Sequence, residues 1–147
     1  MDITEELRAK LEKTASRLAA RPVILYFHDA PKNGDCGWTA DTHELAIRLN
    51  PHLLSNAPFL LQVFLHEAGH AAYSEFKPVY DIPAGDKIAN DQAATWWQGA
   101  CVVGGHGLGY LPKDINELGK FLDVLMKFGK EKHIIRNGKR VAVTFKR

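Results

Sequence analysis

The stretch SNAPFLLQVFLHEAGHAAYSEF, residues 55–76, decides the fold of this 147-residue chain. Ser55 or Asn56 can cap a helix there, and Pro58 is tolerated in the first helical turn. The residues before His66 are apolar on nearly every side, which is typical of a helix at the centre of a domain. We therefore expect a buried helix over this stretch.

Working outward from this helix, the sequence predicts both helices and strands. Leu7, Leu11 and Leu18 recur at helical spacing, whereas the run Val23–Phe27 is rich in strand-forming residues. The expected elements are a helix over 4–20, a strand over 23–27, a loop over 29–37, a hairpin over 38–49, the central helix, a helix over 84–100, an irregular glycine-rich segment over 104–109, a helix over 114–128 and a hairpin over 133–145. This order predicts an α+β fold with a short N-terminal sheet.

Length and composition favour one globular domain over residues 1–147, with a core over 1–103 and a C-terminal extension over 104–147. The chain has two cysteines and no Cys-x-x-Cys pattern, so a reducing compartment is the simpler interpretation. We find no signal-peptide layout and no apolar run that spans a bilayer, and expect a cytoplasmic protein without a membrane partner. The sequence carries no indication of the oligomeric state.

The segment His66-Glu67-Ala68-Gly69-His70 matches the pattern His-Glu-x-x-His. Residues four apart share one face of a helix, so both imidazoles can reach a single metal ion. Glu67 then lies beside that ion, where its carboxylate can take a proton from an attacking water. The other interpretation is two ordinary histidines on a helix. The buried context and the small Gly69 favour a metal site, and we expect Zn²⁺ as the cofactor.

A catalytic zinc site normally has three protein ligands, so the two histidines need a third residue. The next predicted helix offers Asp86 and Asn90 on one face, with small Ala89 and Ala93 allowing close packing. We expect Asp86 to be the third ligand and the Asn90 amide oxygen to accept from a ligand imidazole. Asp86 is also an ordinary residue for the first turn of a helix. The other candidates for the third ligand are His106, Asp91, Asp81 and Glu75.

These segments together resemble the ImmA/IrrE-like metallopeptidases, small zincins of the minimal gluzincin type. The likeness covers about residues 1–100 and rests on Leu49-Asn50-Pro51 after a strand, on His66–His70, and on Asp86–Ala93. The last segment is similar to the family's Glu-x-x-Ala-Asn/Asp-x-x-Ala, with Asp in the ligand position. Because Asp is one methylene shorter than Glu, either the second helix lies closer to the first or another residue is the ligand. The pair Trp96-Trp97 also departs from the family's aliphatic ending.

The resemblance implies a zinc-dependent endopeptidase with His66, His70 and Asp86 as ligands and Glu67 as the base. Known members of the family cut regulatory proteins, commonly phage or stress-response repressors. A protein substrate is therefore the expected partner, in the cytoplasm of a bacterium or of the host of a phage. The alternative is a catalytically silent zincin-like module that binds a partner or serves structure in a phage or mobile-element assembly. Intact Glu67 argues against this alternative, because a structural site gains nothing from a base.

Two further residues are candidate catalytic groups. His106 or Tyr110 can stabilise an oxyanion if the glycine-rich segment forms a mobile loop that reaches the metal. The other interpretation of this segment is a tight surface turn. Trp96 and Trp97 are adjacent on a helix, so we expect one in the core and the other at a groove or surface.

The C-terminal segment 127–147 holds eight Lys and Arg against one Glu. Such a segment can contact nucleic acid, but aromatic residues do not alternate with the basic ones here. We expect a solvated hairpin face and no nucleic-acid partner.

Overall fold

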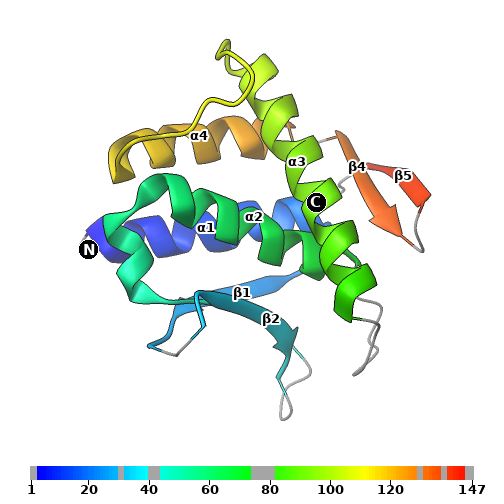
Figure 1. Cartoon of the computed structure of the whole chain (residues 1–147), viewed down its shortest axis with the longest axis horizontal. Helices are drawn as coiled ribbons and strands as arrows, with labels where there is room; N and C mark the ends of the chain where they lie inside the picture. Colours follow the sequence, from blue (N-terminus) through cyan, green and yellow to red (C-terminus); the bar gives the residue numbers. More distant parts are fainter. Residues whose placement is uncertain are drawn as a thin grey trace.

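The computed structural model describes residues 3–29, 32–39, 44–73, 82–128, 131–136 and 139–144 of the chain (Figure 1). Its elements are α1 (Ile3–Ala19), β1 (Val23–Phe27), β2 (Gly34–Trp38), β3 (Leu45–Leu49), the 3₁₀ turn η1 (Pro51–Ser55), α2 (Ala57–Tyr73), α3 (Ile82–Val103), α4 (Ile115–Phe128), β4 (Glu131–Arg136) and β5 (Lys139–Thr144). The fold is mixed α+β, as predicted, with the four helices on one side of the three-stranded sheet (Figure 1). None of the described helices combines the length and apolar character needed to cross a membrane.

The three-stranded sheet has the order β1-β3-β2. β1 runs parallel to β3, with Val23 opposite Leu45, and β2 runs antiparallel to β3, with Gly34 opposite Leu49. The predicted hairpin is therefore present, but its first strand begins at Gly34 and not at Trp38. The prediction of a loop over 29–37 was wrong for residues 34–37.

Gly34 explains this error, because it is a packing glycine and not a turn glycine. A Cβ atom at Gly34 would lie 3.0 Å from Val63 Cγ1 and 3.1 Å from the Arg48 carbonyl oxygen. The missing side chain lets β2 lie directly against α2. β2, the strand that lies against α2 at Gly34, is therefore the strand whose glycines led to the prediction of a loop.

The helices follow the predicted hydrophobic periodicity. α1 and α4 lie within two residues of their predicted bounds, and Asp114 caps α4 by accepting from the Glu117 amide at 2.8 Å. α3 is longer at both ends than the predicted 84–100. The predicted last residues of the central helix, 74–76, lie outside the described residues, as does the turn at 137–138 between β4 and β5.

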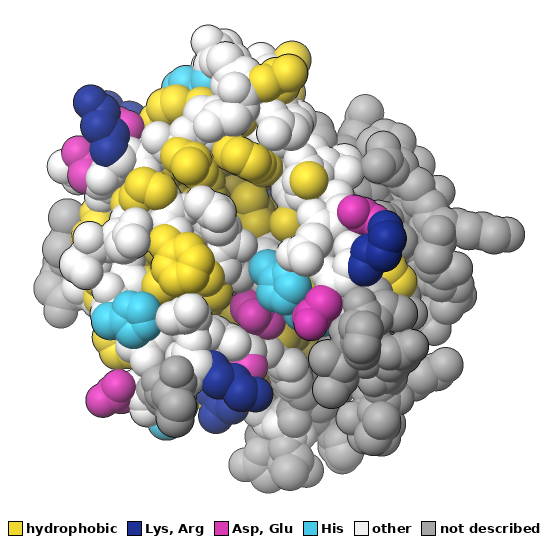
Figure 2. Space-filling view, in the orientation of Figure 1, with side chains coloured by type: hydrophobic (Ala, Val, Ile, Leu, Met, Phe, Trp, Pro, Cys, Tyr) yellow, Lys and Arg dark blue, Asp and Glu magenta, His cyan; other side chains and the backbone are white. Residues whose placement is uncertain are grey.

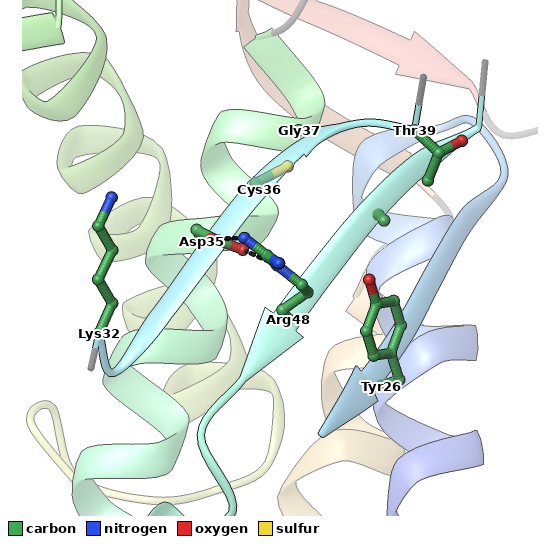
Figure 3. A pocket seen from close by; sticks show the side chains of 8 residues that line it. Tyr26, Lys32, Asp35, Cys36, Gly37, Thr39 and Arg48 are labelled. Carbon is green, nitrogen blue, oxygen red and sulfur yellow. Dashed lines mark hydrogen bonds and ion pairs between the residues drawn. The ribbon is translucent and has the colours of Figure 1, made fainter. Parts of the chain in front are cut away.

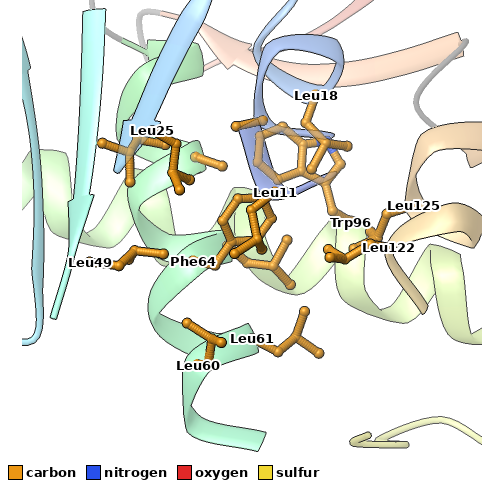
Figure 4. Packing of buried hydrophobic residues seen from close by; sticks show 14 of the residues in the cluster. Leu11, Leu18, Leu25, Leu49, Leu60, Leu61, Phe64, Trp96, Leu122 and Leu125 are labelled. Atoms are coloured by element: carbon orange, nitrogen blue, oxygen red, sulfur yellow. The ribbon is translucent and has the colours of Figure 1, made fainter. Parts of the chain in front are cut away.

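The core lies between the sheet and the helices and takes side chains from all four helices (Figure 4). Its largest fully buried members include Leu11, Leu18, Leu25, Leu49, Phe64, Phe121 and Trp96. Of the two adjacent tryptophans, of which one was expected in the core, Trp96 is fully buried and Trp97 is half-buried. Leu118, Leu122 and Leu125 of α4 belong to the same cluster, so α4 is packed into the core and not appended to it.

Candidate metal centre

The motif residues lie where α2 and α3 cross. A Cβ atom at Gly69 of α2 would stand 2.7 Å from the carbonyl oxygen of Ala89 and 2.9 Å from its Cα, so the helices touch backbone to backbone there. His66 and His70 lie on either side of this contact on α2, and Asp86 lies one turn before it on α3. The second helix is therefore close enough for the short Asp side chain to reach both histidines.

The three side chains place their donor atoms in a small triangle. Asp86 Oδ1 lies 2.9 Å from His70 Nε2 and 3.3 Å from His66 Nε2, and the two Nε2 atoms are 3.1 Å apart. Three ligands of a tetrahedral zinc ion, each about 2.0–2.1 Å from the metal, are separated from one another by roughly 3.3 Å. The triangle therefore has nearly the dimensions that a zinc ion requires. In Figure 2 the histidine and acidic side chains meet near the middle of the visible face.

Asn90 fixes the protonation pattern of His66. Its Oδ1 atom lies 2.7 Å from His66 Nδ1, which confirms the hydrogen bond predicted from the sequence. Because an amide oxygen only accepts, the ring proton of His66 is on Nδ1. In the neutral ring this leaves Nε2, the atom that faces the triangle, unprotonated, so that it accepts from His70 Nε2 here and could instead bind a metal ion.

His70 is held in the neutral form by its surroundings. Burial lowers the pKa of its imidazole, and the neighbouring His66 lowers this pKa further, although Asp86 acts in the opposite direction. A neutral imidazole is the form that binds metal ions. Both histidines are thus prepared as ligands by contacts that the fold supplies.

Glu67 lies beside the triangle without joining it. It is 7% exposed, and one carboxylate oxygen lies within 4.8 Å of a ring nitrogen on each histidine. Burial raises the pKa of Glu67 to about 7, and the negative charges of Asp35 and Asp86 also raise it, against the effect of His66. A carboxylate in this position accepts and returns a proton near neutral pH. Asp86 Oδ1 contacts both imidazoles, at 2.9 and 3.3 Å, so Asp86 stays a candidate for the third ligand beside the nearby Glu67.

Asp91, another candidate for the third ligand, has a different partner. Asp91 pairs with Lys87 at 2.9 Å on the exposed side of α3. Glu75 and Asp81 lie outside the described residues.

His106 and Tyr110 belong to the loop that follows α3, and this loop lies at the end of α3 away from Asp86 (Figure 1). The length of α3 from Asp86 to Val103 is about 25 Å, at a rise of roughly 1.5 Å per residue. The two rings stack on each other with centroids 3.9 Å apart, and the Tyr110 hydroxyl donates to Glu117 at 3.1 Å. The structure therefore does not bring the candidate catalytic residues His106 and Tyr110 to the histidines. The physical reason is that α3 continues past residue 100 and carries its terminal loop away.

Of the two interpretations of this segment, a mobile loop and a tight surface turn, the contacts of the loop favour the turn. Trp97 Nε1 donates to the Tyr110 carbonyl oxygen at 2.7 Å, and the His106 amide donates to the Cys101 carbonyl oxygen at 2.8 Å. Gly105 and Gly109 have positive φ angles, as a tight surface turn requires.

The sequence did not predict that β2 borders the site. Gly34 packs on Val63, one helical turn before Glu67, so the strand continues over Glu67 itself. Burial raises the pKa of the Cys36 thiol, and the nearby charge of Glu67 raises it further. One pattern in the sequence could have indicated this strand. Gly34 and Cys36 are small residues two positions apart, so they share one face of a strand, and a helix can pack against that face.

A separate cavity of about 440 Å³ lies on the open side of the sheet, with the helices behind it (Figure 3). Arg48 Nε donates to Asp35 Oδ1 at 2.7 Å in its wall, and the guanidinium also contacts Oδ2. This cavity faces away from the histidines and is not part of the metal centre.

Comparison with known proteins places the chain in no family. No protein-family model, no curated protein and no solved structure gives a significant match to it.

Proposed function

We propose that this chain is a zinc-dependent peptidase with a zincin-like arrangement, as its resemblance to the ImmA/IrrE-like metallopeptidases implies. The observation that carries the proposal is the triangle of His66 Nε2, His70 Nε2 and Asp86 Oδ1 with a buried carboxylate beside it. The donor set suits zinc, because two neutral imidazoles and one carboxylate are a common catalytic combination. A single negative charge also leaves the centre net positive and able to act as a Lewis acid.

Bound zinc would supply Lewis-acid activation of water and of a substrate carbonyl. The protein residues do the rest. His66, His70 and Asp86 would hold the ion, and Asn90 keeps His66 in the ligating tautomer. Glu67 removes a proton from the attacking water and returns it to the amine that leaves when the peptide C–N bond breaks.

The exposure of the site supports a catalytic role over a structural one. The Asp86 side chain is 49% exposed, so the triangle opens to solvent on the side of α3. Structural zinc sites are closed by four protein ligands. Among the described residues, the only group of three or more His, Cys, Asp or Glu arranged to hold a metal is His66, Glu67 and His70, to which Asp86 adds its contacts. No fourth His or Cys of the described residues joins that group, which favours an open catalytic site over a closed structural one.

β2 offers a place for an extended substrate. It pairs with β3 along one edge, and within the described part of the chain no strand pairs with its other edge. A free strand edge can take up a peptide through backbone hydrogen bonds. Because β2 runs over the helix face that carries Val63 and Glu67, a peptide bound there would pass the base.

Metal content tests the ligand set. Elemental analysis of purified wild type, Asp86→Ala and Asp91→Ala should find one zinc per chain in the wild type and in Asp91→Ala, and loss in Asp86→Ala. Asp91 is the matched control, since it is an exposed aspartate on the same helix. Two histidines and one carboxylate also bind non-haem iron, so iron in place of zinc would contradict the proposal. Zinc retained in Asp86→Ala would move the third ligand elsewhere.

Turnover tests the base. Glu67→Gln keeps the shape of the side chain and removes its proton acceptor. Each zinc-loaded protein is incubated with a random-peptide mixture, and the products are analysed by mass spectrometry. The wild type should cleave peptides, and Glu67→Gln should lose at least most of that activity. Equal cleavage by both proteins would exclude Glu67 as the base.

A further inference from the structure

The cavity on the open side of the sheet has a floor of small residues (Figure 3). Ala46 of β3 pairs with Gly37 of β2, and both residues line the cavity. A Cβ atom at Gly37 would meet no atom within 4 Å, so the space above this residue is open. The cavity volume of about 440 Å³ lies in the range that is usual for small-molecule sites.

The next row of side chains across the sheet forms one wall of this cavity. Arg48 follows Ala46 by two positions, so the two side chains point to the same face of β3. Its partners in the register are Tyr26 of β1 and Asp35 of β2. The Tyr26 ring stands beside the cavity, and the residue is 39% exposed (Figure 3). β1 and β2 are two strand spacings apart, about 9–10 Å, which leaves room for a flat ring next to Tyr26.

Arg48 presents a second set of hydrogen-bond donors. A guanidinium has five N–H groups, and Asp35 accepts one from Nε and one from Nη2. The remaining N–H groups, on Nη1 and Nη2, have no partner among the residues that the structure describes. Two of them form a second planar fork, which matches two oxygens of a carboxylate or a phosphate. Because Asp35 already holds the guanidinium in place, little side-chain entropy is lost when this fork binds a ligand.

The other polar groups of the lining also favour an anion. The Lys32 side chain lies on the other side of the Asp35–Arg48 pair from Tyr26, and within the described ranges no carboxylate pairs with it (Figure 3). The Tyr26 hydroxyl has no hydrogen-bond partner in the same part of the chain. The described lining therefore holds two positive charges, on Lys32 and Arg48, against the single negative charge of Asp35.

We propose that this cavity binds a small organic anion, a molecule with a flat ring and one carboxylate or phosphate group. The ring lies over Gly37 and Ala46, beside Tyr26. The anionic group accepts from the second fork of Arg48, and Lys32 adds a further positive charge. The cavity faces away from the metal centre, so the inference does not rest on the proposed peptidase activity.

Nuclear magnetic resonance of the nitrogen-15-labelled full-length protein tests this site. Benzoate and phenyl phosphate are the anionic probes and distinguish a carboxylate from a phosphate, and benzamide is the neutral control with the same ring. At least one of the anions should shift the amide signals of residues 34–39 and 45–49. Its Kd should be about 1 mM or lower, which is ordinary for about ten non-hydrogen atoms. Benzamide should bind at least about tenfold more weakly, because it makes no charge-assisted pair with Arg48.

Two variants remove the site in different ways. Arg48→Lys keeps the positive charge beside Asp35 but lacks the planar fork, and should weaken anion binding by at least about tenfold. Gly37→Val fills the floor and should abolish binding. Its new side chain enters open space, and valine favours a strand, so the fold is retained. Gly107→Val is the matched control, since a Cβ atom at Gly107 also meets nothing within 4 Å, and it should bind as the wild type does.

The position of the shifted signals separates this site from the metal centre. An open zinc site also takes up anions, but that binding would need the metal and would shift the signals of α2 and α3. Binding in the cavity should be equal in metal-free and zinc-loaded protein. The inference is overturned if neither anion binds, if binding needs zinc, if benzamide binds as tightly as the anions, or if either Arg48→Lys or Gly37→Val leaves the affinity unchanged. Each of these results leaves the proposed peptidase activity untouched.

Discussion

Replacing Gly69 with alanine perturbs the backbone contact on which the metal centre is built. The new Cβ atom would lie 2.9 Å from Ala89 Cα and 2.7 Å from the Ala89 carbonyl oxygen. Carbon atoms in contact prefer about 3.5–4.0 Å, so α2 and α3 have to separate by roughly 0.6 Å at this point. Both are backbone neighbours, and neither can rotate away as a flexible side chain would.

The separation affects the metal centre more than the fold. Overpacking of this kind costs about 1–3 kcal/mol, and the better helix propensity of alanine offsets about 1 kcal/mol of it. The expected net loss in the free energy of unfolding is therefore at most about 2 kcal/mol. Metal ligands, by contrast, have to be placed to within about 0.2 Å, and a shift of roughly 0.6 Å between His66 and Asp86 exceeds this tolerance. We expect zinc affinity to fall by at least 10–100-fold, about the effect of losing a residue that orients a ligand.

A competition titration against a chromophoric chelator measures the affinity, and urea unfolding measures the stability. Gly119→Ala is the matched control, because Gly119 lies inside α4 and its Cβ would meet only Lys10 Nζ at 3.9 Å. This control should gain about 0.5–1 kcal/mol and bind zinc as the wild type does. If Gly69→Ala gains stability like the control and keeps wild-type zinc affinity, the crossing does not set the ligand geometry.

Three further predictions follow from the same contacts. Asn90→Leu removes the acceptor of the His66 Nδ1 proton and should weaken zinc binding by about 10–100-fold in the competition titration, whereas exposed Lys87→Leu should not. Zinc at a hundredfold excess over its Kd should stabilise wild type by about 2.7 kcal/mol and raise its Tm, and an unchanged zinc-dependent rise in His70→Ala would remove His70 from the site. In the metal-free protein, the free energy of unfolding of Glu67→Gln should exceed that of the wild type by a margin that grows from pH 5 to pH 8 and reaches about 3 kcal/mol, as measured by urea unfolding. Parallel stability curves for the two proteins would contradict the raised pKa of Glu67.

Periodicity in the sequence was sufficient to predict the helices and the contact of Asn90 with His66. Periodicity predicts which residues share a helix face. His66 and His70 share a face of α2, Asp86 and Asn90 share a face of α3, and close packing of the two helices brings these faces together. The predicted start of β2 was wrong because glycines such as Gly34 and Gly37 are ordinarily turn residues. Whether a glycine makes a turn or admits a neighbouring helix depends on Val63, which is 29 positions further along the chain.

The position of His106 could not be predicted for a different reason. Residue spacing along a chain becomes a distance only when the intervening structure is known. A loop directly after residue 100 can fold back toward α2 or away from it. Three more helical residues and the bond from Trp97 to the Tyr110 carbonyl oxygen direct it away. The anchoring contact joins a side chain to a backbone atom, and such a pairing leaves no pattern in the sequence.

Glu67 connects the stability of the fold to the chemistry proposed for it. In the metal-free protein its carboxyl group holds a proton up to about pH 7, whereas in an unfolded chain it would lose that proton near pH 4.5. The folded state therefore binds more protons across this window, and its stability falls as the pH rises through it. A cation beside the carboxylate reverses this balance, because it favours the charged form. We therefore expect zinc to reduce the stability difference between the wild type and Glu67→Gln at pH 8. A difference that zinc leaves unchanged would mean that the bound ion does not lie beside Glu67.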